Sequence, residues 1–221
     1  MDFAPLIQAY RARFDWTWDR NLGWENVRFV VLDSESTGLN AERDSIISIG
    51  AVGVFDFEIR LDDAFEIIMP VAYNSASVMI HGITREEAAE EGTPEPEALA
   101  QFLEYLGDGV IVGHHIEHDI KMLNVACRRH FDQELQNLWV DTMNLTLVLA
   151  EHGAFPEEEG FTDFSLDGLC RRFGLKAHDR HTAPGDAFLT AQIFLRLLKT
   201  AKRQRLLRLG QLMAAPTPPE Q

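Results

Sequence analysis

The sequence predicts an α/β fold in which helices pack on a mixed five-stranded sheet. Two observations lead to this fold class. Three strand-like segments follow one another with short connections, which favours a three-stranded antiparallel meander. Helix-like and strand-like segments then alternate along the rest of the chain, as is typical of a sheet covered by helices.

The meander begins with residues 27–32, an apolar and β-branched run that is typical of a buried central strand. Asp33 follows at the C-terminal end of this strand. Residues 45–54 and 64–69 are the second and third predicted strands. Thr84 then opens a capping-box pattern, Thr-Arg-Glu-Glu, which predicts the start of a helix.

The second half of the chain supplies the helices and two further strands. Pro94 fits the first position of a helix, and apolar residues recur at helical spacing from there to Leu106. Ser165 is expected to cap a helix that runs to Phe173 and is terminated by Gly174. The remaining predicted elements are strands 110–113 and 138–141, a helix over 117–130, a helix ending at 149, and a last core helix over 183–198.

Three regions are expected along the chain. Residues 1–26 form an N-terminal arm with a helix-like segment and several tryptophans, which should pack on the domain through its aromatic side chains. A partner-binding arm is the alternative. Residues 27–198 form the core domain. Residues 199–221 begin as a basic, leucine-containing helical extension and end in a proline-rich tail whose composition predicts disorder.

Composition restricts the possible functions. The chain carries 20 Lys and Arg against 35 Asp and Glu, so it cannot offer the generally basic surface that sequence-independent duplex binding uses. Nucleic acid would have to bind at a small site where metal ions supply the positive charge, which favours an enzyme acting on a strand end.

The cellular setting follows from what the sequence lacks. No segment approaches the roughly 20 apolar residues of a membrane helix, and the N-terminus does not resemble a signal peptide. Cys127 and Cys170 lie in apolar, helix-like stretches and are expected to be reduced core thiols. We therefore expect a cytoplasmic protein that does not contact membranes.

Two carboxylates at the end of the first strand are candidates for metal binding. Asp33 and Glu35 are two positions apart, so on a strand their side chains point the same way. Like charges this close are unfavourable unless a cation or a proton lies between them. Mg²⁺ takes oxygen ligands of this kind. A solvent-exposed strand end is the structural alternative.

Two further clusters lie at other element ends. Asp119 and Asp186 are each expected in the first turn of a helix, where acidic residues also occur simply because the helix dipole favours them. His181 lies in the loop before the last helix and could act as a general base near neutral pH, with His178 as a competing candidate. Each cluster alone is more often structural, but all three lie at element ends, where functional residues concentrate.

These clusters together resemble the exonuclease motifs of DnaQ-like proteins, specifically the DEDDh type found in epsilon proofreading subunits. Segments 80–84, 140–142 and 165–174 also resemble family segments, and the resemblance covers about residues 27–198. It implies a ribonuclease-H-like, three-layer fold. The three motifs are Asp33-x-Glu35-x-Thr37-Gly38, Val112-Gly113-His114 with Asp119, and His181-x-Ala183-x-x-Asp186-Ala187.

The resemblance implies a 3′→5′ exonuclease that uses two divalent metal ions, Mg²⁺ or Mn²⁺. Asp33 would bridge the two ions. Glu35 and Asp186 would hold the ion that activates water, and Asp119 would hold the other. His181 would deprotonate the attacking water. The residues expected near the terminal nucleotide are Thr37, Gly38, Leu39, His81 and His115.

The second motif departs from the family pattern at two positions. His115 stands where the family usually has Asn, and His118 stands where it usually has Phe. These changes affect the fine contacts to substrate and the packing behind Asp119. They remove no metal ligand.

Three functions follow from these observations. The first is a metal-dependent 3′→5′ exonuclease on single-stranded ends, with DNA as the expected substrate. The second is a proofreading-type subunit that binds a DNA polymerase or clamp; its basis is the basic tail and Gln211-Leu212-Met213, although a helix end whose cations complement the dipole explains the tail more simply. The third is an RNA-trimming enzyme, although no residue indicates a contact to the 2′-OH.

Overall fold

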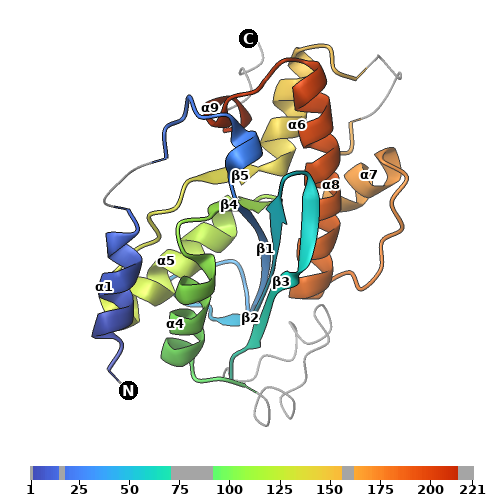
Figure 1. Cartoon of the computed structure of the whole chain (residues 1–221). Coiled ribbons are helices and arrows are strands. Elements are labelled where there is room, and N and C mark those ends of the chain that lie inside the picture. The colour runs from blue at the N-terminus through green and yellow to red at the C-terminus, as the bar shows by residue number, and fades with distance from the viewer. Residues whose placement is uncertain (1, 15–17, 71–91, 156–161, 214–221) are drawn as a thin grey trace, which may run out of the picture.

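A computed structural model describes residues 2–14, 18–70, 92–155 and 162–213. Within these ranges five strands form one mixed sheet in the order β3-β2-β1-β4-β5 (Figure 1). The meander comprises β1 (Phe29–Ser36), β2 (Ile46–Phe55) and β3 (Glu58–Ile68), all paired antiparallel. β4 (Val110–Gly113) and β5 (Trp139–Asp141) extend the sheet in parallel from the other side of β1. The predicted α/β fold class is confirmed.

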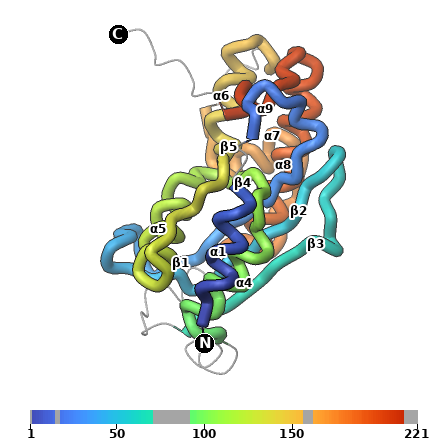
Figure 2. Tube along the Cα trace, turned by 60° about the vertical axis from the view of Figure 1, so that its left-hand side comes forward, coloured from blue at the N-terminus to red at the C-terminus, as the bar shows by residue number. Residues whose placement is uncertain are grey.

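Helices cover both faces of the sheet and make three layers (Figures 1 and 2). The pleat of β1 sends Phe29 and Val31 into one core cluster and Val30 and Leu32 into the other. The first cluster lies under α6 (Thr142–Glu151), α7 (Leu166–Arg172) and α8 (Ala183–Arg203). The second lies under α1 (Ala4–Ala12), α4 (Glu95–Leu106) and α5 (Glu117–Phe131).

Two strands are longer than predicted. β1 continues to Ser36, so Asp33 lies within the strand and not at its end. β3 begins at Glu58, six residues before the predicted start, because a tight turn at Asp56 and Phe57, both at positive φ, returns the chain directly along β2. The first part of β3 is an edge segment in which charged residues alternate with Ile59 and the exposed Leu61, so it lacks the continuous apolar run of the buried strands.

The N-terminal and C-terminal segments both pack on the core domain. Ile7 and Tyr10 of α1 are buried, and the Tyr10 hydroxyl donates to Asn137 Oδ1 at 2.5 Å. Trp24, in a short 3₁₀ helix (Trp24–Asn26), donates its indole N–H to the Leu206 carbonyl at 2.8 Å. Figure 2 shows the N-terminal chain passing beside α9 (Leu209–Leu212).

The predicted boundary between residues 198 and 199 falls inside a continuous helix, because α8 runs to Arg203. Leu212, from the segment with a faint resemblance to a clamp-binding peptide, is 1% exposed and belongs to the core. It is therefore not presented to a partner in this conformation. The predicted helix from Thr84 and the proposed substrate contact His81 lie outside the described residues, as does the predicted disordered tail from residue 214.

Ser165 caps α7 as predicted, since its hydroxyl oxygen accepts from the Gly168 N–H at 3.1 Å. Cys127 and Cys170 are both buried free thiols. Within the described ranges, no helix has the length and apolar character needed to cross a membrane.

Candidate active site

The site is built on the last residues of β1. Asp33 and Glu35 continue the alternation of Phe29 and Val31, so they project from the α8 face of the sheet. Ser34 lies between them and belongs to the opposite face, on which α5 packs. One strand therefore presents carboxylates to α8 and a hydroxyl to α5.

A glycine brings α8 against these carboxylates. Gly50 on β2 pairs with Asp33, and a Cβ atom at this position would lie only 2.2 Å from the backbone nitrogen of Pro184. Only a residue without a side chain lets the first turn of α8 lie directly on the sheet here. Thr182 caps the helix by accepting from the Gly185 N–H, which fixes its first turn.

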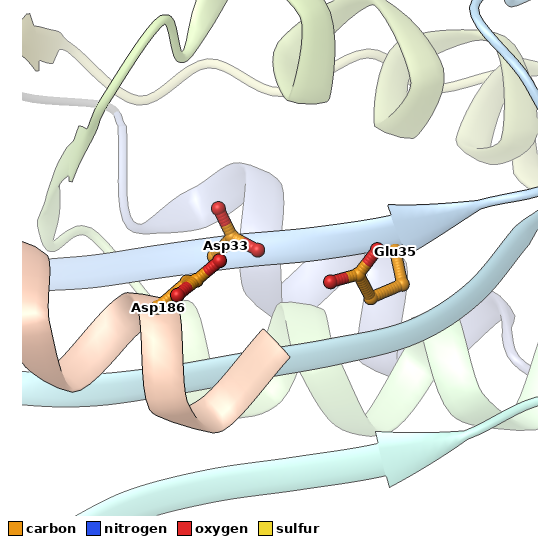
Figure 3. A group of neighbouring side chains, drawn as sticks. All are labelled: Asp33, Glu35 and Asp186. Carbon is orange, nitrogen blue, oxygen red and sulfur yellow. The ribbon is translucent and has the colours of Figure 1, made fainter. Parts of the chain in front are cut away.

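Asp186, in that first turn, completes a group of three carboxylates. Ligand oxygens of Asp33, Glu35 and Asp186 all lie within 4.8 Å of one another (Figure 3). Residues more than 150 positions apart in the sequence thus converge on one point. Three of the four predicted metal ligands are brought together in this way.

Asp119 lies beside this group. It is in the first turn of α5, and its Oδ1 accepts from Ser34 N–H at 3.0 Å and from Ser34 Oγ at 2.6 Å. Ser34 thereby ties the fourth predicted ligand to the strand that carries two of the others. The Asp119 charge is close enough to raise the pKa values of both Asp33 and Glu35.

The carboxylates repel one another in a partly desolvated setting. Burial, followed by the charges of Asp119, Asp186 and Glu35, raises the pKa of Asp33 well above its usual value. Burial, followed by the charges of Asp186 and Asp119, raises the pKa of Glu35 to about 7. Burial raises the pKa of Asp119 to about 6, against the stabilising hydrogen bonds from Ser34. Clustered carboxylates that retain protons near neutrality suit hard divalent cations, which take oxygen ligands.

His181 lies at the edge of this cluster. Its backbone N–H donates to Asp186 Oδ2 at 3.2 Å, its φ is +62°, and its side chain is exposed. This backbone hydrogen bond holds His181 next to Asp186, the candidate metal ligand in the first turn of α8. His178, the competing candidate for the base, is also exposed.

Arg180 is a site residue that the sequence did not indicate. Its Nη1 forms an ion pair with Asp186 Oδ1, and its Nε donates to Asp167 Oδ1 of α7 at 2.7 Å. The signal available in the sequence was one arginine immediately before His181, and an isolated arginine in a loop is most often a surface residue.

The turn between β4 and α5 is held by polar contacts from α6. Thr142 Oγ1 donates to the Gly113 carbonyl at 3.2 Å and lies 2.9 Å from His114 Nδ1, so it accepts from that ring nitrogen. Burial lowers the pKa of His114 to about 4, so this imidazole is neutral at physiological pH. Asp141, also missed by the sequence analysis, caps α6 and accepts from the Ile116 N–H at 3.0 Å.

The loop after β1 is organised by Asp44. Its carboxylate accepts from Thr37 Oγ1 at 3.2 Å and from the Asn40 N–H at 2.8 Å. A Cβ atom at Gly38 would lie 2.5 Å from this carboxylate, so the glycine leaves room for Asp44. Leu39, at the tip of the loop, is 85% exposed.

Leu39 and His115 line one cavity of about 420 Å³. His118 and Lys121 of α5 also line it, as does Asp141. His115 is exposed at a φ of +58°. Two of the five predicted nucleotide contacts therefore share a depression, whereas Thr37 and Gly38 lie in the adjoining loop.

Comparison with known proteins identifies the family. The family model described as "Exonuclease" (RNase_T) matches residues 30–194. The chain belongs to this exonuclease family. The DnaQ-like resemblance is also confirmed by a relative: this chain is 31% identical over 172 residues to the DNA polymerase III subunit epsilon of Aquifex aeolicus, covering 77% of this chain and 80% of that protein.

Other relatives are much longer than this chain. The PolC-type DNA polymerase III of Thermotoga petrophila is 33% identical over 198 residues, which is 87% of this chain but 14% of that protein. Among solved structures, E. coli Exonuclease I in complex with a dT13 oligonucleotide has a TM-score of 0.68 at 19% identity, over 80% of this chain and 42% of that one. This likeness shows the ribonuclease-H-like fold.

Proposed function

We propose that this exonuclease removes nucleotides one at a time from the 3′ end of single-stranded DNA, releasing nucleoside 5′-monophosphates, with two divalent cations, Mg²⁺ or Mn²⁺, as cofactors. The observation that supports this most strongly is the convergence of three carboxylates within 4.8 Å, with Asp119 adjacent. The raised pKa values of Asp33 and Glu35 add to it: burial and then the charges of neighbouring carboxylates disfavour the ionised forms, which a bound cation would stabilise.

The proposed metal ligands are Asp33, Glu35, Asp186 and Asp119, and their oxygen donors fit hard divalent ions. When bound, such ions offset the charge of the scissile phosphate and lower the pKa of water. Asp33 lies centrally in this set, because its pKa is raised by each of the other three carboxylates. This central place suits the role of a ligand shared by both ions.

His181 is the proposed general base. Its backbone N–H is bound to Asp186 and the residue is exposed, so an imidazole on this loop would take a proton from a water molecule at the carboxylates and return it to solvent. Positive φ at His181 fixes the direction in which the loop leaves this contact.

The cavity between Leu39 and His115 is the proposed site for the terminal nucleotide. Lys121 at its wall forms an exposed ion pair with Glu117 at 2.8 Å and would have to leave this partner to contact a phosphate, and the exposed Leu39 offers an apolar surface for a base. Single-stranded DNA is the favoured substrate because Exonuclease I, which shares this fold, has been crystallised with dT13 and dA16 oligonucleotides.

Association with a DNA polymerase is a second candidate role. Its support is the similarity to an epsilon subunit over 80% of that protein and to segments of PolC-type polymerases. The buried Leu212 argues against the C-terminal peptide as the contact, so a surface of the folded domain is the more reasonable interface.

Digestion of a 5′-labelled single-stranded oligonucleotide tests the proposal. With Mg²⁺ or Mn²⁺ we expect a ladder that shortens from the 3′ end, mononucleotide products, and no cleavage in EDTA or with Asp186→Asn. Matched DNA and RNA oligonucleotides decide the substrate class. Loss of label as a free 5′ nucleotide, or no cleavage with either metal, would contradict the proposal.

A further inference from the structure

Arg180 supplies positive charge to an otherwise acidic cluster. Among the ion pairs of the described residues, its pair with Asp186 is the one that reaches the four carboxylates. Its charge lowers the pKa values of Asp33 and Glu35, opposing the neighbouring acids. The guanidinium is only 20% exposed, so water screens this interaction weakly.

Both carboxylate oxygens of Asp186 already contact a group of the protein. Arg180 Nη1 contacts Oδ1, and the backbone N–H of His181 donates to Oδ2 at 3.2 Å. Each oxygen keeps a second lone pair, but the guanidinium places a positive charge directly on Oδ1, and this charge repels a divalent cation that approaches the same carboxylate. The backbone hydrogen bond is part of the loop that begins α8, whereas the arginine side chain can move.

Arg180 also has a second anchor that does not depend on Asp186. Its Nε donates to Asp167 Oδ1 at 2.7 Å, and Asp167 lies on α7, outside the carboxylate cluster. The guanidinium presents several N–H donors in a fixed plane, so one edge can stay on Asp167 while the other leaves Asp186.

We infer that Arg180 is a displaceable internal counter-ion of the acidic cluster. It neutralises Asp186 when divalent cations are absent, gives up this carboxylate when they bind, and remains held by Asp167. Because Arg180 immediately precedes His181, its release from Asp186 also changes the loop that carries the proposed base. This inference rests on the proposed metal site and adds a competitor for it.

Direct measurement of Mn²⁺ binding at pH 8, by calorimetry or by electron paramagnetic resonance, tests this role. Arg180→Gln should bind Mn²⁺ roughly tenfold more tightly than the wild type, about 1.4 kcal/mol, because no internal cation competes. Arg171→Gln is the matched control: it removes the same charge from a neighbouring but exposed pair with Asp163, and its affinity should be unchanged. Unchanged or weaker binding by Arg180→Gln would overturn the inference.

Thermal melts separate this role from a merely structural one. In EDTA, Arg180→Gln should melt below the wild type, because the carboxylates lose their counter-charge. In saturating Mn²⁺ the difference in melting temperature between the two proteins should decrease, since the bound ions supply the missing positive charge. An equal difference in melting temperature in both conditions would mean that Arg180 only links α7 to α8 structurally.

If the wild type itself binds no Mn²⁺, the proposed function fails as well. If the wild type binds Mn²⁺ and Arg180→Gln binds it no more tightly, only this inference fails.

Discussion

The two ends of β1 both carry charged residues, but they balance charge in opposite ways. Just before the strand, Arg28 donates to both carboxylate oxygens of Asp63, each at 2.9 Å, and to the carbonyls of Leu106 and Tyr105. The guanidinium also lies 5.1 Å from the centroid of the Tyr105 ring. One cation meets one anion, and the hydrogen bonds are satisfied within the fold.

At the other end of the strand, four carboxylates share one arginine. Burial raises the pKa values of Asp33, Glu35 and Asp119, and repulsion from neighbouring carboxylates raises those of Asp33 and Glu35 further, so the ionised cluster is electrostatically unfavourable in the folded protein. A balanced pair such as Arg28 and Asp63 stabilises the sheet, whereas an unbalanced cluster marks where an external cation is needed. Substitutions at the two ends should therefore have opposite signatures.

The largest effect is expected at the acidic end. Asp186→Asn keeps the shape of the side chain but removes a proposed ligand charge, so nuclease activity should fall by about 10³-fold or more. The melting temperature in EDTA should stay level or rise, because one repelling charge is gone. Oligonucleotide digestion and thermal melts check the two parts. A large drop in melting temperature would mean that the main role of Asp186 is to stabilise the fold.

The opposite pattern is expected at the balanced end. Asp63→Asn leaves the Arg28 guanidinium without its charged partner, and because the pair is about one-third exposed we expect a loss of about 1–2 kcal/mol in the free energy of unfolding. Activity below the melting transition should be unchanged. Urea denaturation measures the stability, and oligonucleotide digestion measures the activity. A loss of activity in the folded variant would contradict the assignment of a purely structural role to this end of β1.

The sequence was informative where local pattern determines structure. Apolar runs located the core strands, and the order and spacing of the three motifs identified the exonuclease family. It missed the first half of β3, because this edge segment has single apolar residues, Ile59 and the exposed Leu61, between charged ones and not the continuous apolar run of a buried strand. It also gave Asp33 a place at a strand end, whereas the strand continues to Ser36.

Contacts between distant segments could not be predicted. Nothing in the local sequence of Gly50 indicates that it faces the backbone of Pro184 and so admits α8 to the site. The partners of Arg180 and Asp141 depend in the same way on how α7, α6 and β4 pack. These residues position the proposed ligands and base, and their roles emerge only from the three-dimensional arrangement.

A smaller effect is expected at Asp141, which supports the substrate cavity from outside the carboxylate cluster. Asp141→Ala removes a helix cap on α6 and the contact to Ile116 N–H, so stability should fall by about 1 kcal/mol. The KM for an oligonucleotide should rise several-fold, because His115 lies on the loosened turn, while kcat changes little. Ser165→Ala removes the cap of α7 and is the control: it should lose similar stability without the change in KM.

The smallest effect is a pH dependence that isolates one proton at the acidic end. In the folded, metal-free protein the pKa of Glu35 is about 7, above the usual glutamate value of 4.5. Between these values the folded state keeps a proton that the unfolded state has released, so stability falls as pH rises through this window and levels off above pH 7. Glu35→Gln has no carboxyl group at this position and lacks this pH dependence. The free energy of unfolding of the variant should therefore increase relative to that of the wild type between pH 5 and pH 8.

Urea denaturation in EDTA across this range measures that difference, and subtraction of the two curves removes most of the contribution from the other titrating groups. A difference that stays constant with pH would mean that Glu35 is already charged at pH 5 and that repulsion in the cluster is weaker than its geometry implies. In saturating Mn²⁺ the order should reverse at pH 8, because the deprotonated Glu35 of the wild type then gains a cation that glutamine binds poorly. The Glu35 carboxylate would thus destabilise the metal-free protein and stabilise the metal-bound one. The contribution of the Arg28–Asp63 pair to stability should change with neither metal nor pH in this range.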